Sequence, residues 1–124
     1  MRVLLVDDES DLASALAERL DMRGIEADWV DSGQEALERA ATVHYDLAVL
    51  DLKMPKIGGL ELKARMQARY PHMKFIFLTG YGSEKDFETV ANDSGEQCYL
   101  VKPVEIEDLI RLMNILTQDA GGRP

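Results

Sequence analysis

Five side chains capable of charge or hydroxyl chemistry stand where apolar runs of the chain end: Asp7, Asp8, Asp51, Thr79 and Lys102. Asp51 is the most unusual of them, because it directly follows the apolar run Leu-Ala-Val-Leu, where burying a carboxylate is costly. Carboxylates held close together repel one another, and burial adds to the cost of their charge. They must be protonated or accompanied by a cation. Carboxylates with a backbone carbonyl suit a hard divalent ion such as Mg²⁺, and Lys102 would add a second positive charge.

The five residues are far apart in the chain, so the elements before them must bring them together. Runs rich in apolar residues predict strands at residues 2–6, 25–30, 46–50, 74–78 and 97–101. Apolar residues at helical spacing predict helices around residues 12–20, 32–41, 60–70, 83–95 and 106–116. Strand and helix thus alternate along the chain, a pattern typical of a parallel sheet with helices on both faces.

The apolar character of each run predicts its place in the sheet. The runs around residues 3–6, 47–50 and 75–78 are almost continuously apolar, as central strands are, whereas residues 25–30 alternate and favour the edge. In open sheets of this class, ligands bind outside the carboxyl ends of the strands. This rule places all five side chains on one rim.

An acidic rim of this kind can bind a phosphoryl group if a divalent ion adds its positive charge to that of Lys102. Phosphoryl transfer depends mainly on positioning and on neutralising oxygen charge. Asp51 could be the nucleophile and form an aspartyl phosphate, and Thr79 could donate its hydroxyl to a phosphoryl oxygen. The alternative is a surface acidic patch around one salt bridge. We disfavour it because residues from separate strands converge on one crevice.

Four short motifs then resemble a known family, the response-regulator receiver domain. They are VDDE at residues 6–9, LDLKMP at 50–55, LTG at 78–80 and YLVKP at 99–103. Their order and spacing match the family over essentially the whole chain. The resemblance implies an α/β fold, a doubly wound, flavodoxin-like (βα)5 arrangement with five parallel strands in the order 2-1-3-4-5. It implies a receiver domain over residues 1–118, with 119–124 as a flexible tail or the start of a linker.

The resemblance also implies a role for each residue of the rim. Asp51 would be the phosphoacceptor, taking a phosphoryl group from the phosphohistidine of a sensor histidine kinase or a phosphotransfer protein. Asp7, Asp8 and Asp51, with the backbone carbonyl of Lys53, would bind Mg²⁺. Such a chain is a signalling switch rather than an enzyme acting on other molecules, although it catalyses its own phosphorylation and slow dephosphorylation.

Three further residues have implied roles in the switch. Lys102 would contact the phosphoryl group, and Thr79 would move towards it on phosphorylation. Tyr99 resembles the aromatic residue that turns inward behind the threonine, and the bond before Pro103 is cis in such domains. A phosphorylation-linked homodimer would use residues 83–118. The chain departs from the family in one turn, where Ile57-Gly58-Gly59 replaces the frequent Met-Asp-Gly.

Composition limits the partners and the compartment. The 124 residues carry a formal net charge of −9, which argues against direct binding to nucleic acid or to an anionic membrane. The start, Met-Arg-Val-Leu-Leu-Val-Asp-Asp, does not resemble a signal peptide. The single cysteine, Cys98, excludes an internal disulfide. We therefore expect a cytoplasmic protein.

The same motifs disfavour three other functions. An aspartate-nucleophile phosphatase of the haloacid-dehalogenase type needs an acid two residues after the nucleophile, where this chain has Lys53. A flavodoxin-like cofactor module needs a hydroxyl- and glycine-rich loop after the first strand, where this chain has Asp7-Asp8-Glu9. A degenerate receiver would lack part of the set, which is complete here. Whether the chain acts alone or as a module of a longer protein stays open, as do its kinase and its target.

Overall fold

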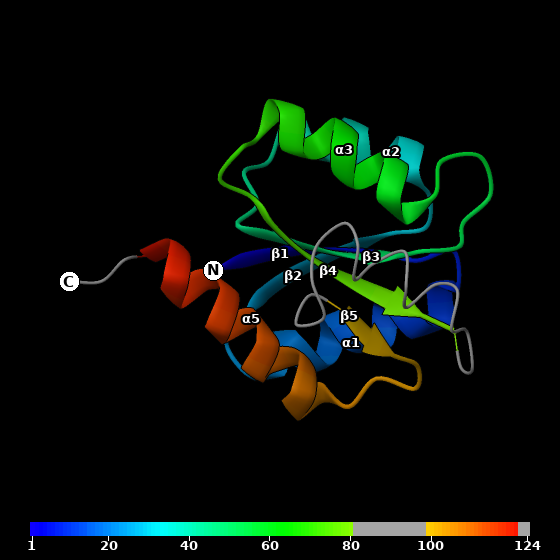
Figure 1. The fold of residues 1–124 in the computed structure, drawn as a ribbon. Coiled ribbons are helices and arrows are strands. Elements are labelled where there is room, and N and C mark those ends of the chain that lie inside the picture. The colour runs from blue at the N-terminus through cyan, green and yellow to red at the C-terminus, as the bar shows by residue number, and fades with distance from the viewer. Residues whose placement is uncertain (81–98, 122–124) are drawn as a thin grey trace.

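The computed structural model describes residues 1–80 and 99–121, which build a parallel sheet between two layers of helices (Figure 1). The strands are β1 (Arg2–Val6), β2 (Glu26–Val30), β3 (Leu47–Asp51), β4 (Lys74–Thr79) and β5 (Tyr99–Val101). They pair in the order β2-β1-β3-β4-β5, all parallel. The predicted α/β fold and strand order are confirmed, with the alternating strand at one edge.

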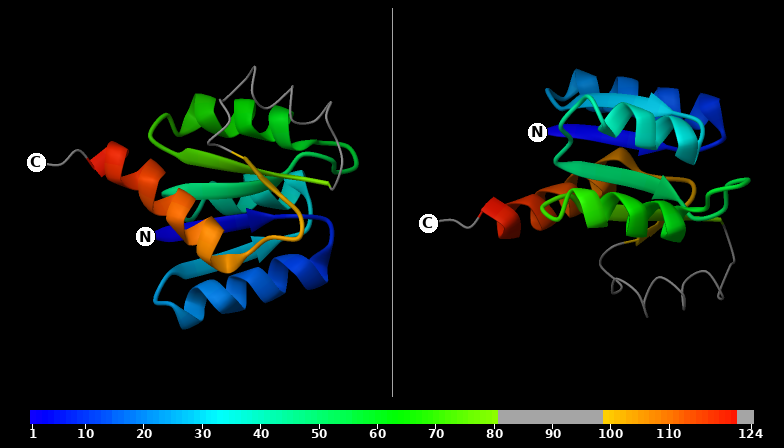
Figure 2. Two further views of the ribbon diagram at one scale, coloured as in Figure 1. Left: turned by 60° about the horizontal axis from the view of Figure 1, so that its bottom comes forward. Right: turned by 90° about the horizontal axis from the view of Figure 1, so that it is seen from above.

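The helices lie on both faces of this sheet, as predicted. They are α1 (Ser10–Met22), α2 (Gly33–Ala40), α3 (Gly59–Arg69) and α5 (Ile106–Gly121). Figure 2 shows α1 and α5 in front of one face in its left view, and α2 and α3 in front of the other in its right view. The helix expected at 83–95 lies outside the described residues, as do Cys98 and the start of the fifth predicted strand.

Two apolar clusters, one on each side of the sheet, hold these layers together. Along β1, Leu4 and Val6 face the cluster under α2 and α3, while Val3 and Leu5 face the cluster under α1 and α5. This alternation follows from the two-residue period of a strand. Every residue of β3 is buried, including Asp51. The central strand is therefore held rigidly on both faces, and its last side chain is fixed in place.

The strand ends meet at one edge of the sheet. Val6 at the end of β1 pairs with Leu50, and Asp51 at the end of β3 pairs with Leu78 of β4. The chain leaves β1 towards α1 and β3 towards α3, on opposite faces, which is the position where open α/β sheets bind ligands. This is the rim on which the sequence pattern placed the reactive side chains.

The last helix is longer than the apolar pattern at 106–116 indicated, since α5 continues to Gly121. The end of the domain at residue 118 stays a prediction. Among the helices that the structure describes, none combines the length and the apolar character needed to cross a membrane.

Candidate functional site at the carboxyl edge of the sheet

Three carboxylates from two neighbouring strands converge at this edge. Asp7 and Asp8 follow β1, Asp51 ends β3, and one oxygen of each lies within 4.8 Å of the others. Asp7 and Asp51 are 2% and 5% exposed, whereas Asp8 is exposed. Among the side chains described in residues 1–80 and 99–117, no other three acidic, histidine or cysteine residues converge in this way. The parallel topology thus brings together residues more than forty positions apart.

Burial makes the charge of Asp51 costly. Loss of water around its carboxyl and the nearby charge of Asp7 raise the pKa of Asp51 to about 7. The ammonium of Lys102 and the N–H of Lys53 act in the opposite direction. That N–H donates to Asp51 Oδ1 at 3.3 Å. Without a further cation, the central carboxyl is therefore close to half protonated at neutral pH.

Lys102 supplies the positive charge at the rim. Its Nζ lies 2.7 Å from Glu9 Oε1, 3.0 Å from Asp7 Oδ2 and 3.6 Å from Asp51 Oδ2. Burial by itself would lower the pKa of Lys102, but the contacts with Glu9 and Asp7 and the charge of Asp51 raise it above its ordinary value. Lys102 therefore stays charged. Its own N–H donates to the carbonyl of Thr79 at 2.9 Å, which fixes the backbone from which the side chain reaches the crevice.

The oxygen atoms of the cluster fit a hard divalent cation. The buried Oδ2 of Asp7 lies near the Lys102 ammonium but receives no well-aligned hydrogen bond from any described group. A buried carboxylate oxygen without a well-aligned donor is costly even beside an ammonium, and a bound cation would reduce this cost. Oxygen atoms are the ligands that Mg²⁺ prefers, and one or two carboxylates with a backbone carbonyl suit an ion that keeps several waters. The donor set at the rim therefore matches the predicted magnesium site, while the metal itself remains a prediction.

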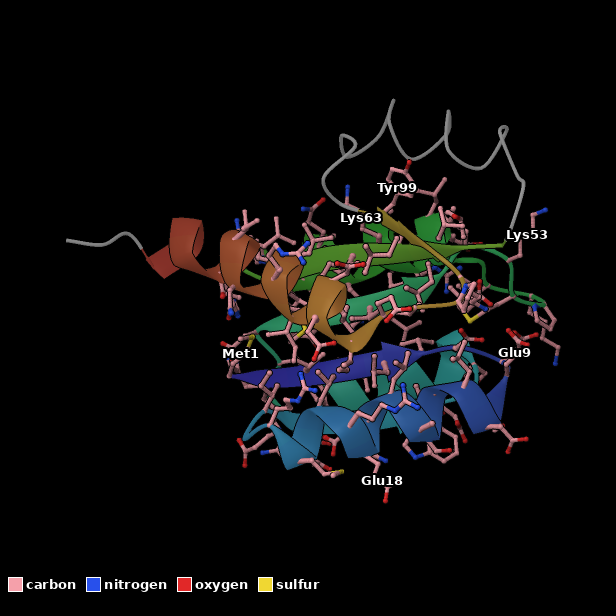
Figure 3. All side chains as sticks on the ribbon, turned by 90° about the horizontal axis from the view of Figure 1, so that it is seen from below. Met1, Glu9, Glu18, Lys53, Lys63 and Tyr99 are labelled. Carbon is pink, nitrogen blue, oxygen red and sulfur yellow. The ribbon has the colours of Figure 1, made fainter. Side chains whose placement is uncertain are left out.

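The other predicted site residues surround this cluster at different depths. Thr79 is 2% exposed and ends β4, the strand that pairs with β3. Tyr99 of β5 pairs with Phe77 of β4 and is half-buried against the cluster under α2 and α3. Phe77 and Thr79 are two residues apart and share a face of the sheet, so Tyr99 lies on the same face as Thr79. Figure 3 shows Glu9 and Lys53 at one end of the sheet, with Tyr99 set back from it. The peptide bond between Lys102 and Pro103 is cis, as the resemblance implied.

Glu9 is the residue of this site that sequence reasoning did not single out. Its contact with Lys102 joins positions 93 residues apart, and a glutamate after two aspartates is also an ordinary surface residue. The available signal was the third acid of the VDDE motif. Because Lys102 is predicted on the same rim, Glu9 could have been expected to lie close enough to pair with it.

The turn after Asp51 depends on a close backbone approach at Gly59. A Cβ atom added there would lie 2.5 Å from the Asp51 carbonyl oxygen and 3.0 Å from Leu52 Cα. The same addition at Gly58 would meet Leu52 O at 3.2 Å. We therefore expect Gly59→Ala to lower the free energy of unfolding by about 2 kcal/mol, because backbone atoms around the predicted phosphoacceptor must shift.

Urea denaturation of both variants measures this effect. Gly58→Ala is the matched control, with an expected loss of about 1 kcal/mol or less. Equal losses for the two variants would contradict the close approach at Gly59.

Comparison with known proteins agrees with this geometry. Residues 3–114 match the model of the response regulator receiver domain. The two-component response regulator PhoP of Pseudomonas aeruginosa is 35% identical over 123 residues, which cover 98% of this chain and 54% of PhoP. The chain thus spans about half the length of that relative.

Solved structures give the same result. The receiver domain of Francisella response regulator 1452 superposes with a TM-score of 0.81 at 30% identity, covering 95% of this chain and 97% of that one. A CheY-like receiver domain protein from Methanospirillum hungatei gives 0.84 at 28% identity, covering 96% and 94%. Because one family model, its motifs and one fold account for almost all of the sequence, the chain belongs to the response regulator receiver domain family.

Proposed function

We propose that Asp51 is the phosphoacceptor of a two-component signalling switch. Its phosphoryl donor would be the phosphohistidine of a sensor histidine kinase or of a phosphotransfer protein. The observation that carries this proposal is the convergence of Asp7, Asp8 and Lys102 on a buried carboxylate at the end of the central strand. Such a carboxylate is rigidly placed, and its surroundings can accept negative charge once a divalent ion is added.

The transfer would be a direct displacement at phosphorus. An oxygen of the Asp51 carboxylate forms the new O–P bond, and the P–N bond of the phosphohistidine breaks. The imidazole nitrogen keeps the bonding electron pair and takes up a proton. Bound Mg²⁺, held by Asp7, Asp8, Asp51 and the Lys53 carbonyl, would supply positive charge that keeps the nucleophile ionised and offsets charge on the phosphoryl oxygens.

The remaining side chains would bind the phosphoryl group on Asp51 and change conformation in response to it. Lys102 would pair with a phosphoryl oxygen, and the Thr79 hydroxyl would donate to another. Tyr99 is half-buried on the face that it shares with Thr79. Movement of Thr79 would open space there, and Tyr99 would turn inward into it. Phosphorylation would then shift the protein between two conformations that a partner distinguishes.

The surface that changes would include β5 and α5. Val101 and Ile115 on these elements are 45% and 46% exposed, and apolar side chains of this kind suit a protein contact. A homodimer through residues 83–118, a separate partner or an attached output domain could use this surface.

Intact-mass spectrometry after incubation with phosphoramidate tests the phosphoacceptor function, because this donor carries the same P–N bond as phosphohistidine. We expect one added phosphoryl group on the wild-type protein with Mg²⁺, and none with a chelator. Asp51→Asn should remain unmodified, whereas the control Asp46→Asn, at the opposite end of β3, should react like wild type. An adduct that forms without Mg²⁺, or that persists in Asp51→Asn, would contradict the proposal.

A further inference from the structure

Among the residues that the structure describes, Glu9 is the nearest acidic partner of Lys102, although it does not belong to the convergent carboxylates. Lys102 Nζ donates a hydrogen bond of 2.7 Å to Glu9 Oε1. The same ammonium is 3.6 Å from Asp51 Oδ2, the group that it would serve in phosphoryl transfer. The lysine is therefore held closer to a bystander carboxylate than to the proposed phosphoacceptor.

Helix capping does not explain the presence of Glu9. It occupies the N-cap position of α1, where Ser, Thr, Asp and Asn are favoured because their side chains accept from the first helical N–H groups. The Glu9 side chain makes no such bond. Its N–H donates to Asp7 Oδ1 at 2.9 Å, which anchors the backbone at the rim. The carboxylate is left to reach Lys102 across the end of the sheet.

The two partners differ in their freedom to move. The Lys102 side chain is 17% exposed, whereas that of Glu9 is 65% exposed. Lys102 is mostly enclosed at the rim, while the exposed Glu9 carboxylate has room to turn into solvent. An anion bound at Asp51 would compete with Glu9 for the same ammonium, since a short charge-assisted hydrogen bond to one acceptor weakens the contact with another.

We propose that Glu9 is a positioning residue that holds Lys102 away from Asp51 until a phosphoryl group arrives. Breaking this ion pair opposes phosphoryl binding and so sets the threshold at which the switch responds. The inference rests on the proposed function of Asp51 and adds an inhibitory role for a residue next to the cluster.

Calorimetric titration with beryllofluoride, a phosphoryl mimic, at saturating Mg²⁺ tests this role. We expect Glu9→Gln to bind it about two- to fivefold more tightly than wild type, the range that an exposed ion pair accounts for. The control Asp11→Asn removes the same charge from the first turn of α1, away from the carboxylates that Lys102 contacts. It should change the affinity by much less, because distant exposed charges are screened by salt.

A double-mutant cycle separates positioning from a general charge effect. If Glu9 acts through Lys102, Glu9→Gln should give no gain in a Lys102→Met background. Urea denaturation and Mg²⁺ titration of each variant show whether folding or metal binding has changed. An equal gain in Asp11→Asn, or a gain that persists in Lys102→Met, would overturn the positioning role.

Two further outcomes also decide against it. Weaker binding of Mg²⁺ and beryllofluoride by Glu9→Gln would overturn the inference and assign Glu9 to the metal site. If wild type binds beryllofluoride and Glu9→Gln binds it with the same affinity, this inference is wrong and the proposed function is unaffected. A wild type that binds no beryllofluoride would overturn the proposed function as well.

Discussion

Replacing Asp51 by Asn is expected to raise the free energy of unfolding of the metal-free protein by about 2–4 kcal/mol at neutral pH. The reason is that the folded protein holds this carboxyl with a pKa of about 7, against 3.8 for an aspartate in water. Asn keeps the shape of the side chain and removes the buried charge. The expected gain is smaller than the free energy that corresponds to the full pKa shift, because the variant also loses the contact with Lys102, 3.6 Å away.

The pH dependence has a definite sign. Between about pH 4 and 7 the folded state binds the Asp51 proton more tightly than the unfolded state does, because its pKa of about 7 lies above the ordinary aspartate value of 3.8. The contribution of this carboxyl to stability is therefore fully present below about pH 4 and is lost as the pH rises through 7. Asp51→Asn should abolish this loss, so the two stability curves should separate as the pH rises.

Urea denaturation in the presence of a chelator, repeated across this pH range, measures the difference. Asp46→Asn is the control, since Asp46 precedes β3 at the opposite end and accepts from the N–H of Arg2. Curves for wild type and Asp51→Asn that stay parallel, or a variant less stable than wild type at neutral pH, would contradict the account of the buried charge.

The second large effect concerns Lys102. Replacing it by Met is expected to lower the free energy of unfolding by about 3 kcal/mol at neutral pH without metal, because removing one partner leaves a buried charge uncompensated. The uncompensated group is Asp7, whose side chain is 2% exposed and lies 3.0 Å from the Lys102 ammonium. Asp51 loses an ammonium 3.6 Å away in the same step.

Mg²⁺ should restore most of this lost stability, since the ion would neutralise the same carboxylates. The control Arg111→Met removes an exposed cation paired with Asp108 at 3.0 Å, and it should cost about 0.5 kcal/mol or less with no response to Mg²⁺. Thermal unfolding with and without the metal gives both numbers. A Lys102→Met variant as mild as Arg111→Met, or one that Mg²⁺ does not rescue, would show that the cluster does not depend on added positive charge.

Much of the fold could be predicted from the sequence because strands and helices alternate with distinct periods. The continuous apolar runs identified β1, β3 and β4 as central strands, and the polar alternation of residues 25–30 identified β2 as an edge. Gly24, just after the first helix, has a φ of 82°, a conformation that glycine adopts without strain and that is common where helices end. These features are local, so the sequence carries them directly. The strand order came from the family resemblance.

The site was predictable as far as topology alone determines it. Parallel strands end on the same edge, so Asp7, Asp8 and Asp51 had to lie near one another whatever their side chains did. The contact between Glu9 and Lys102 was not predictable in this way, because it depends on rotamers of two long side chains. The close approach of Gly59 to the Asp51 carbonyl was also missed, since the sequence shows two adjacent glycines without showing which one the backbone requires.

The most direct test of the central claim is chemical identification of the phosphorylated residue in the wild-type protein. After incubation with phosphoramidate and Mg²⁺, borohydride reduces an aspartyl phosphate to homoserine, and peptide mass spectrometry then locates the altered position. We expect homoserine at residue 51, in the peptide that contains Leu50 and Leu52, and at no other aspartate. Homoserine at Asp7 or Asp8, or a phosphoryl group that resists reduction and maps to another residue type, would contradict the assignment of Asp51 as the phosphoacceptor.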